Sequence, residues 1–154
     1  MTTSSDVGQR GKWAEKQVQD WLQARSLASV DFAFHRFPDA RAAQGKLSAQ
    51  PADYFCSWRG VGAFMLEVKE TKETSRLPKA KISQYGKLKL FDLAGVYTRV
   101  VVYISALNVW CCLTDHDLFS FEMCPASFKL STQRFHTVDE VMSCVFGPIR
   151  KTSV

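Results

Sequence analysis

Apolar and polar positions alternate with a helical period in some stretches of the chain and with a strand period in others. In residues 5–25 the apolar side chains recur at helical spacing along one face. These side chains are Trp13, Ala14, Val18, Trp21 and Leu22. Residues 30–37 alternate apolar and polar side chains, which is typical of a half-buried strand. Two more strand-like runs follow, 52–58 and 61–69, and we expect a turn at Arg59-Gly60 between them.

The second half of the chain predicts helices and one more hairpin. A polar, basic loop over 70–78 precedes a helix over residues 80–93, with Gly95 as its C-cap. Residues 98–107 predict a buried strand, and 109–113 predict its hairpin partner across Asn108.

Capping signals predict two further helices near the C-terminal end of the sequence. Thr114 or Asp115 caps a short helix that reaches Leu118. Residues 137–140 form a capping box, which opens a last helix that Gly147-Pro148 ends. The order of elements predicts one α/β domain over residues 1–154, with a restriction-endonuclease-like core in which helices flank a mixed central sheet.

Composition supports a globular domain. The chain has 154 residues, of which 46% are hydrophobic, so it can bury a sizeable core. No apolar run reaches the roughly 18 residues of a membrane helix, and the first residues lack a signal-peptide pattern, so we expect a cytoplasmic protein. The five cysteines show no Cys-x-x-Cys pair, and the sequence therefore does not indicate zinc.

Positive charge is concentrated in the middle of the chain. The net charge is +5, and seven cations fall between residues 69 and 89. They are Lys69, Lys72, Arg76, Lys79, Lys81, Lys87 and Lys89. A solvated helix face and a polyanion-binding surface explain this stretch equally well by itself. Beside candidate catalytic carboxylates it favours DNA, and we expect Lys72, Arg76, Lys79, Lys81 and Lys87 to bind it.

The candidate chemistry lies on the two middle strands. Glu67 and Lys69 are two residues apart on one strand, so their side chains point to the same face. A two-residue turn would place Asp53 opposite Leu66, on the wrong face. A three-residue turn or a β-bulge pairs Trp58 with Gly62 and places Asp53 opposite Glu67, and we therefore predict that arrangement.

Asp53 and Glu67 would offer hard oxygen ligands to Mg²⁺ or Mn²⁺, with the carbonyl of Val68 as a further ligand. Such an ion lowers the pKa of a bound water beside a phosphodiester. Lys69 would orient that water or stabilise charge in the transition state, and we favour the electrostatic role.

Two residues outside these strands complete the predicted catalytic set. Glu15 lies at the margin of the first helix's apolar face, from which a carboxylate reaches over a sheet edge to ligate the ion directly or through a water. Gln84 would hold water or phosphate from the next helix.

The Asp53-x13-Glu67-x-Lys69 pattern resembles the PD-(D/E)xK nuclease superfamily. Residues 67–72, the basic loop and Gln84 are similar to Holliday-junction resolvases of the RecU type, and residues 8–15 are similar to the glycine-then-glutamate helix of several resolvases, archaeal ones included. The resemblance implies that Asp53, Glu67 and Lys69 form the core site, with Glu15 and Gln84 as accessory residues. It also implies branched DNA as substrate and a homodimer, since symmetric cleavage needs two related sites.

Two other functions stay open at this stage. The same site would serve an exonuclease or a nicking nuclease on linear or duplex DNA. An inactive nuclease fold that only binds DNA is the third possibility, although clustered carboxylates without a metal would repel phosphate.

Overall fold

The computed structural model describes residues 4–39, 49–120 and 125–150, except for the side chains of 4–10 and 148–150. The helices are α1 (Ser4–Ala28), the 3-10 turn η1 (Lys79–Lys81), α2 (Tyr85–Leu93), α3 (Asp115–Phe119) and α4 (Val138–Arg150). The strands are β1 (Phe32–Arg36), β2 (Tyr54–Trp58), β3 (Gly62–Thr71), β4 (Arg76–Pro78), β5 (Tyr97–Ile104), β6 (Val109–Thr114) and β7 (Ser127–Lys129).

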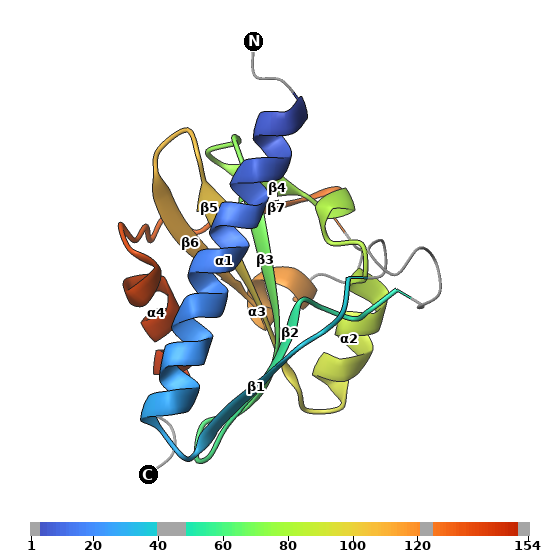
Figure 1. Cartoon of the computed structure of the whole chain (residues 1–154). Coiled ribbons are helices and arrows are strands. Elements are labelled where there is room, and N and C mark those ends of the chain that lie inside the picture. Colours follow the sequence, from blue (N-terminus) through green and yellow to red (C-terminus); the bar gives the residue numbers. More distant parts are fainter. Residues whose placement is uncertain (1–3, 40–48, 121–124, 151–154) are drawn as a thin grey trace.

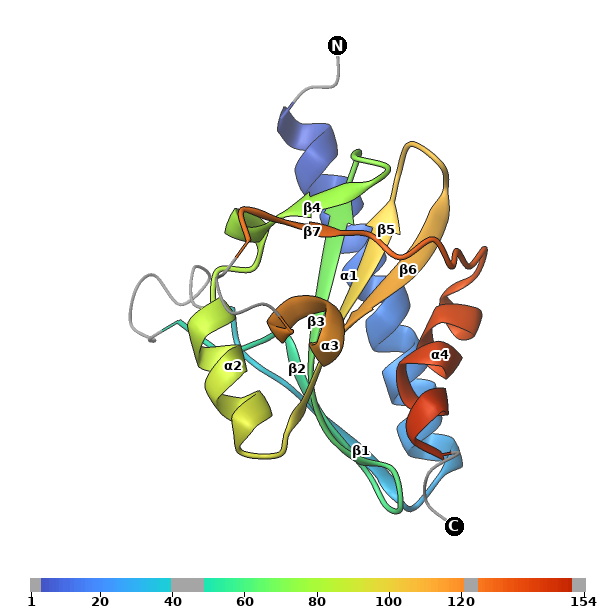
Figure 2. The ribbon, with the colours of Figure 1, turned by 180° about the vertical axis from the view of Figure 1, so that it is seen from behind.

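A five-stranded mixed sheet in the order β1-β2-β3-β5-β6 forms the centre of the fold. Strands β3 and β5 are parallel, and the other neighbouring pairs are antiparallel. Figure 1 shows α1 crossing one face of the sheet, and Figure 2 shows α2 and α3 on the opposite face. The element order and the mixed sheet between helices confirm the predicted α/β class.

Each face of the sheet has its own hydrophobic core. Ala14, Val18 and Leu22 of α1 are fully buried at a spacing of four residues, which is one face of a helix. They share a core with α4 and with the side chains of β3 that point toward α1, such as Leu66 and Val68. The second core lies under α2 and α3 and includes Leu88. Each helix is therefore held by its apolar stripe.

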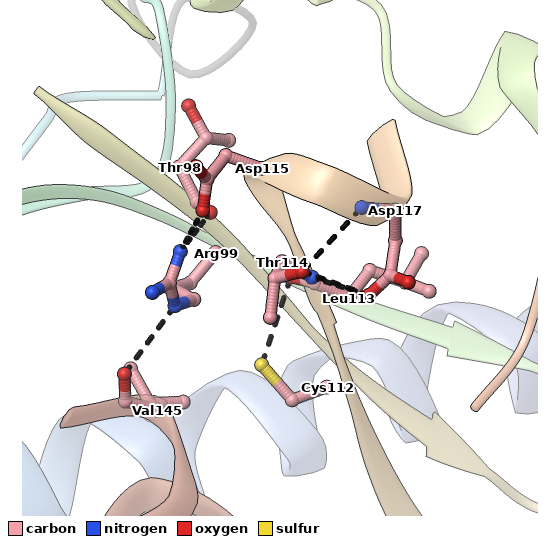
Figure 3. A network of polar contacts seen from close by, with 8 residues as sticks. All are labelled: Thr98, Arg99, Cys112, Leu113, Thr114, Asp115, Asp117 and Val145. Atoms are coloured by element: carbon pink, nitrogen blue, oxygen red, sulfur yellow. Dashed lines mark hydrogen bonds and ion pairs between the residues drawn. The ribbon is translucent and has the colours of Figure 1, made fainter. Parts of the chain in front are cut away.

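A buried arginine ties α3 and α4 to β5 (Figure 3). Arg99 is only 4% exposed, and its guanidinium pairs with Asp115 at the start of α3. Its Nε donates to the carbonyl of Val145 in α4 at 3.3 Å. A capping box between Thr114 and Asp117 fixes the same turn of α3, as the sequence predicted for Thr114. These contacts fix β5, the parallel partner of β3.

The predicted helix over residues 80–93 is wrong in its first turn. The chain forms η1 and then starts α2 only at Tyr85, with Gln84 as N-cap. The cause is the small β4–β7 sheet, in which Leu77 pairs with Phe128 and the amide of Lys79 donates to Ala126. This pairing holds the chain to β7 up to Lys79, so η1 follows directly and α2 begins only after it. The 70–78 segment is accordingly not all loop.

The predicted end of the last helix is also wrong, because α4 continues through Gly147 and Pro148 to Arg150. Glycine and proline only disfavour a helix, whereas Val141, Val145 and Phe146 are buried in the core and hold α4 in place. The helix start is confirmed: the amide of Glu140 donates to Thr137 Oγ1 at 3.2 Å. No helix among the described residues is long and apolar enough to cross a membrane.

Candidate functional site

The β2–β3 hairpin has the three-residue turn that the sequence predicted. Trp58 pairs with Gly62, and the amide of Val61 donates to the carbonyl of Trp58 at 3.0 Å. Gly60 adopts φ of 77°, in the left-handed region that glycine favours. The ladder then pairs Tyr54 with Leu66, and one residue further along Asp53 lies opposite Glu67.

Asp53 is fixed by the strands on both sides. Its carbonyl accepts a hydrogen bond from the amide of Phe37 at 2.9 Å. Its side-chain Oδ2 accepts one from the amide of Val68 at 2.8 Å. Burial raises the pKa of Asp53, while the Val68 amide and the charges of Lys69 and Arg36 oppose that rise. The carboxylate is therefore held in one place with one oxygen engaged by β3.

Glu67 is a buried carboxyl group whose charge is only partly balanced by Lys69. It is only 4% exposed, and burial together with the negative charge of Asp53 raises its pKa to about 7, against the lowering effect of Lys69. Lys69 Nζ lies 3.3 Å from Glu67 Oε2. The contact is an ion pair by distance, but Oε2 has no hydrogen bond of good geometry. This buried carboxylate oxygen has the capacity to accept a further partner beside Lys69.

The carbonyl of Val68 faces the same space. Within a strand the N–H and C=O of one residue point to the same side, and the Val68 amide points to Asp53. The Val68 carbonyl therefore points to the β2 side of β3. The β2–β3 pairing ends at Tyr54 and Leu66, so it does not extend to Val68.

Glu15 approaches the site from α1, at the end of β1 where Arg36 lies. Burial and the negative charge of Asp53 both raise the pKa of Glu15. Arg36 opposes that rise, with Nη2 at 3.3 Å from Glu15 Oε1. The charge of Asp53 therefore acts on Glu15, and the role of Glu15 as a ligand stays a prediction.

Two further residues belong to this site that the sequence did not reveal. Arg36 at the end of β1 lowers the pKa of both Glu15 and Asp53, so its charge faces both carboxylates. Asp39 raises the pKa of the same two groups. Arg36 pairs with Tyr54, the neighbour of Asp53. Knowledge of the register of β1 would therefore have placed this arginine near the site.

A divalent cation fits the donors that these residues offer. Asp53, Glu67 and the Val68 carbonyl present hard oxygens, and Glu67 Oε2 is buried without a hydrogen-bond partner. Among the residues that the structure describes, no three His, Cys, Asp or Glu side chains lie close enough to enclose a metal ion. Hard oxygens of this kind are the ligands that Mg²⁺ takes in proteins, together with several waters.

Gln84 is not brought to this site by any contact in the described part of the chain. It is the N-cap of α2, it is half-buried, and its carbonyl accepts from the amide of Leu88 at 2.9 Å. Its assignment as a catalytic residue stays a prediction.

The predicted DNA-binding cations follow the chain from the end of β3 to α2. Lys81 Nζ donates to the carbonyl of Glu70 at 3.0 Å, and Arg76 bonds Ser127 of β7. Lys79 lies over the ring of Tyr85, 5.0 Å from its centroid. Lys87 Nζ is 3.5 Å from the carbonyl of Ala49. Lys72 follows β3 directly and is exposed.

No family model matches the chain, and no curated protein matches its sequence. Among solved structures, the chain is similar to Hjc, a Holliday junction resolvase from the archaeal hyperthermophile Archaeoglobus fulgidus. That similarity has a TM-score of 0.48 and 21% sequence identity, and it covers 77% of this chain and 88% of the Hjc chain.

Proposed function

We propose that this protein is a divalent-metal-dependent endodeoxyribonuclease that cleaves branched DNA, in the manner of a Holliday-junction resolvase. The observation that carries the proposal is the buried Glu67 carboxylate opposite Asp53, with an oxygen that lacks a hydrogen bond and with Lys69 beside it. Buried acids with perturbed pKa values are typical of functional sites. Asp53, Glu67 and the Val68 carbonyl would hold Mg²⁺ or Mn²⁺, which supplies an activated water and offsets charge on the phosphate.

Lys69 acts as the electrostatic residue of the site. Its ammonium is partly buried, with 24% of the side chain exposed, and it lies 3.3 Å from Glu67. Its ammonium donates hydrogen bonds to a phosphate oxygen or orients the attacking water. Glu15 would ligate the ion directly or through a water, and Arg36 Nη2 lies 3.3 Å from its Oε1.

The basic segment from Lys72 to Lys87 provides the surface for the DNA backbone. It begins one residue after β3 ends and therefore starts three residues from Lys69. Its cations can neutralise phosphates on both sides of the one being cleaved. Branched DNA and a homodimer are the parts of this proposal supported by the sequence resemblance, because two related sites are needed to cut a four-way junction symmetrically.

A cleavage assay tests the proposal. Purified protein is incubated with a labelled four-way junction and with a linear duplex of the same sequence, in Mg²⁺, Mn²⁺ or EDTA. We expect paired symmetric nicks on the junction only, which EDTA and Asp53→Asn abolish. The variant is a matched control because the amide oxygen of asparagine still accepts the hydrogen bond from Val68.

The other outcomes select the remaining functions. Cutting of the linear duplex in preference to the junction would keep the metal site and replace the substrate with linear DNA. Tight DNA binding that Mg²⁺ does not change, with no cleavage of either substrate, would overturn the enzyme assignment in favour of an inactive DNA-binding nuclease fold.

A further inference from the structure

An aromatic cluster lies on the far flank of α1 from the acidic site. Trp13 stacks on Trp110, with ring centroids 6.0 Å apart and planes at 29°. Tyr103 closes the cluster, with its ring centroid 5.0 Å from Trp13 and 4.9 Å from Trp110. Trp110 is 2% exposed, whereas Trp13 is 45% exposed. Trp13 is therefore a preorganised aromatic surface, supported from beneath and open to solvent.

This surface forms one wall of a cavity of about 410 Å³, lined by Trp13, Tyr103, Ser105 and Asn108. A volume of this size is within the range of small-ligand sites. Asn108 sits at the tip of the β5–β6 hairpin with φ of 51°, and its Oδ1 accepts from the Tyr103 hydroxyl at 2.6 Å. That bond orients the amide and leaves its N–H donors without a partner among the described residues.

Ser105 adds a second polar group to the cavity. Its Oγ donates to the carbonyl of Thr71 at 3.3 Å, so its lone pairs remain to accept a hydrogen bond. The cavity thus presents a flat aromatic wall, an amide donor and a hydroxyl acceptor. A nucleobase has that combination in complementary form, with a π-face and both donors and acceptors on its edge.

The cavity is connected to the acidic site through β3 and α1. Thr71, whose carbonyl accepts from both the amide and the hydroxyl of Ser105, is two residues beyond Lys69. Trp13 is two residues before Glu15 on α1, a rotation of about 200° that places the two side chains on opposite flanks of the helix. Two residues of a strand span about 7 Å, so the Ser105 wall of the cavity lies close to Lys69 along β3.

We propose that this cavity binds an unpaired nucleobase of the DNA substrate by stacking it on Trp13, with Asn108 and Ser105 on its edge. The inference deepens the proposed function, on which it rests for the identity of the substrate as DNA. Base binding in this cavity would make the protein prefer DNA with unstacked bases, such as a branch point, over fully paired duplex.

A second copy of the chain would be the other occupant of this surface. A stable protein interface covers about 800 Å² on each partner. Among the residues that line the cavity, the exposed large apolar side chain is Trp13. The cavity and the free amide of Asn108 favour a small flat ligand.

Binding is measured in EDTA, by fluorescence anisotropy, with two labelled oligonucleotides of equal length. One carries thymine at every position and the other is abasic, so they share phosphates and differ only in bases. We expect Trp13→Ala to weaken binding of the thymine oligonucleotide about tenfold and Trp13→Phe by less than about threefold, while binding of the abasic one stays unchanged.

Two further variants separate the base contact from folding. Asn108→Asp keeps the oxygen that accepts from Tyr103 and tolerates positive φ, but it replaces the amide donor, so we expect weaker thymine binding with an unchanged melting temperature. Leu90→Ala removes an exposed apolar side chain from α2 and should change neither affinity.

Equal losses for both oligonucleotides in Trp13→Ala, or no loss with either, would overturn the inference. Sedimentation that shows a dimer dissociated by Trp13→Ala would instead assign the surface to a second copy. Because these readouts need no cleavage, a failure of the nuclease proposal in the junction assay is distinguishable from a failure of the base-binding site.

Discussion

The backbone amide of Val68 donates a hydrogen bond of 2.8 Å to the carboxylate of Asp53, the residue that precedes β2. One contact therefore fixes the acid, aligns the end of the β2–β3 hairpin and leaves the other carboxylate oxygen for chemistry. Loss of charge and loss of the hydrogen bond at Asp53 have separable effects, because asparagine retains the acceptor and alanine does not.

Substitutions of Asp53 should accordingly divide activity from stability. We expect Asp53→Asn and Asp53→Ala both to lower the cleavage rate more than about a hundredfold. Substituting residues that only hydrogen-bond to metal ligands already lowers metal affinity or activity about 10- to 100-fold. Asp53→Ala should also lose about 1–3 kcal/mol of unfolding free energy, because the part-buried Val68 amide is left without its acceptor. Urea denaturation of the two variants checks this, and equal stabilities would contradict the role of the hydrogen bond.

Glu67 predicts an unusual pH dependence of stability for the metal-free protein. Its pKa in the folded state is raised to about 7, above the 4.5 of an unperturbed glutamate. The stabilising contribution of the bound proton is therefore complete below pH 4.5 and is lost as the pH rises through 7. Glu67→Gln should be more stable than wild type at pH 8 in EDTA, by roughly 1–3 kcal/mol.

Urea denaturation in EDTA at pH 5 and at pH 8 measures this difference. The stability advantage of Glu67→Gln over wild type should grow between the two pH values. Glu70→Gln, which changes a glutamate three residues further along β3, serves as the control. An advantage that is equal at both pH values would contradict the assigned pKa.

Alanine substitutions at the two hairpin glycines should lower stability, whereas the same substitution at a glycine in α2 should raise it. Gly60 has φ of 77°, so Gly60→Ala should cost about 1 kcal/mol. Gly62 has φ of 143°, and a Cβ there would lie 3.0 Å from the Tyr97 ring, so Gly62→Ala should cost more. Gly86 in α2 has open space around it, and Gly86→Ala should stabilise by about 0.5–1 kcal/mol. Thermal melts rank the three variants, and a neutral Gly60→Ala would contradict the turn geometry.

DNA affinity should depend on salt through the basic segment. Each phosphate contact that is lost lowers the slope of log affinity against log salt concentration by about 0.9 on duplex DNA. We expect Lys79→Gln and Lys87→Gln each to lower that slope by about this amount. Lys16→Gln, which removes an exposed cation of α1 paired with Asp20 at 2.9 Å, should leave it unchanged. Equal slopes for all four proteins would exclude this surface from the interface.

The hairpin that carries the acids was predictable because its signals are local. The apolar alternation of the two strands and the glycines after Trp58 specify the register together, and the structure pairs Trp58 with Gly62 as expected. Helix periodicity placed Glu15 at the edge of the α1 stripe for the same reason, since its neighbours on the helix decide its direction.

The residues that sequence reasoning missed depend on contacts distant in the chain. Arg36 joins the site only because β1 pairs with β2 across the segment that includes residues 37–53, a pairing for which no short pattern exists. The late start of α2 has the same origin, because β4 pairs with β7 some 50 residues away, and three-residue strands carry too short an alternation to be recognised.

The acids face each other because the two arms of the hairpin are equally long: five steps separate Asp53 from Trp58, and five separate Gly62 from Glu67. The loop between the arms can gain or lose residues without disturbing this match, whereas one residue added within either arm sends a carboxylate to the opposite face. Related chains can therefore differ in the interval between the two acids, and a search pattern with a fixed interval will overlook them. Equal arm length is the property to search for.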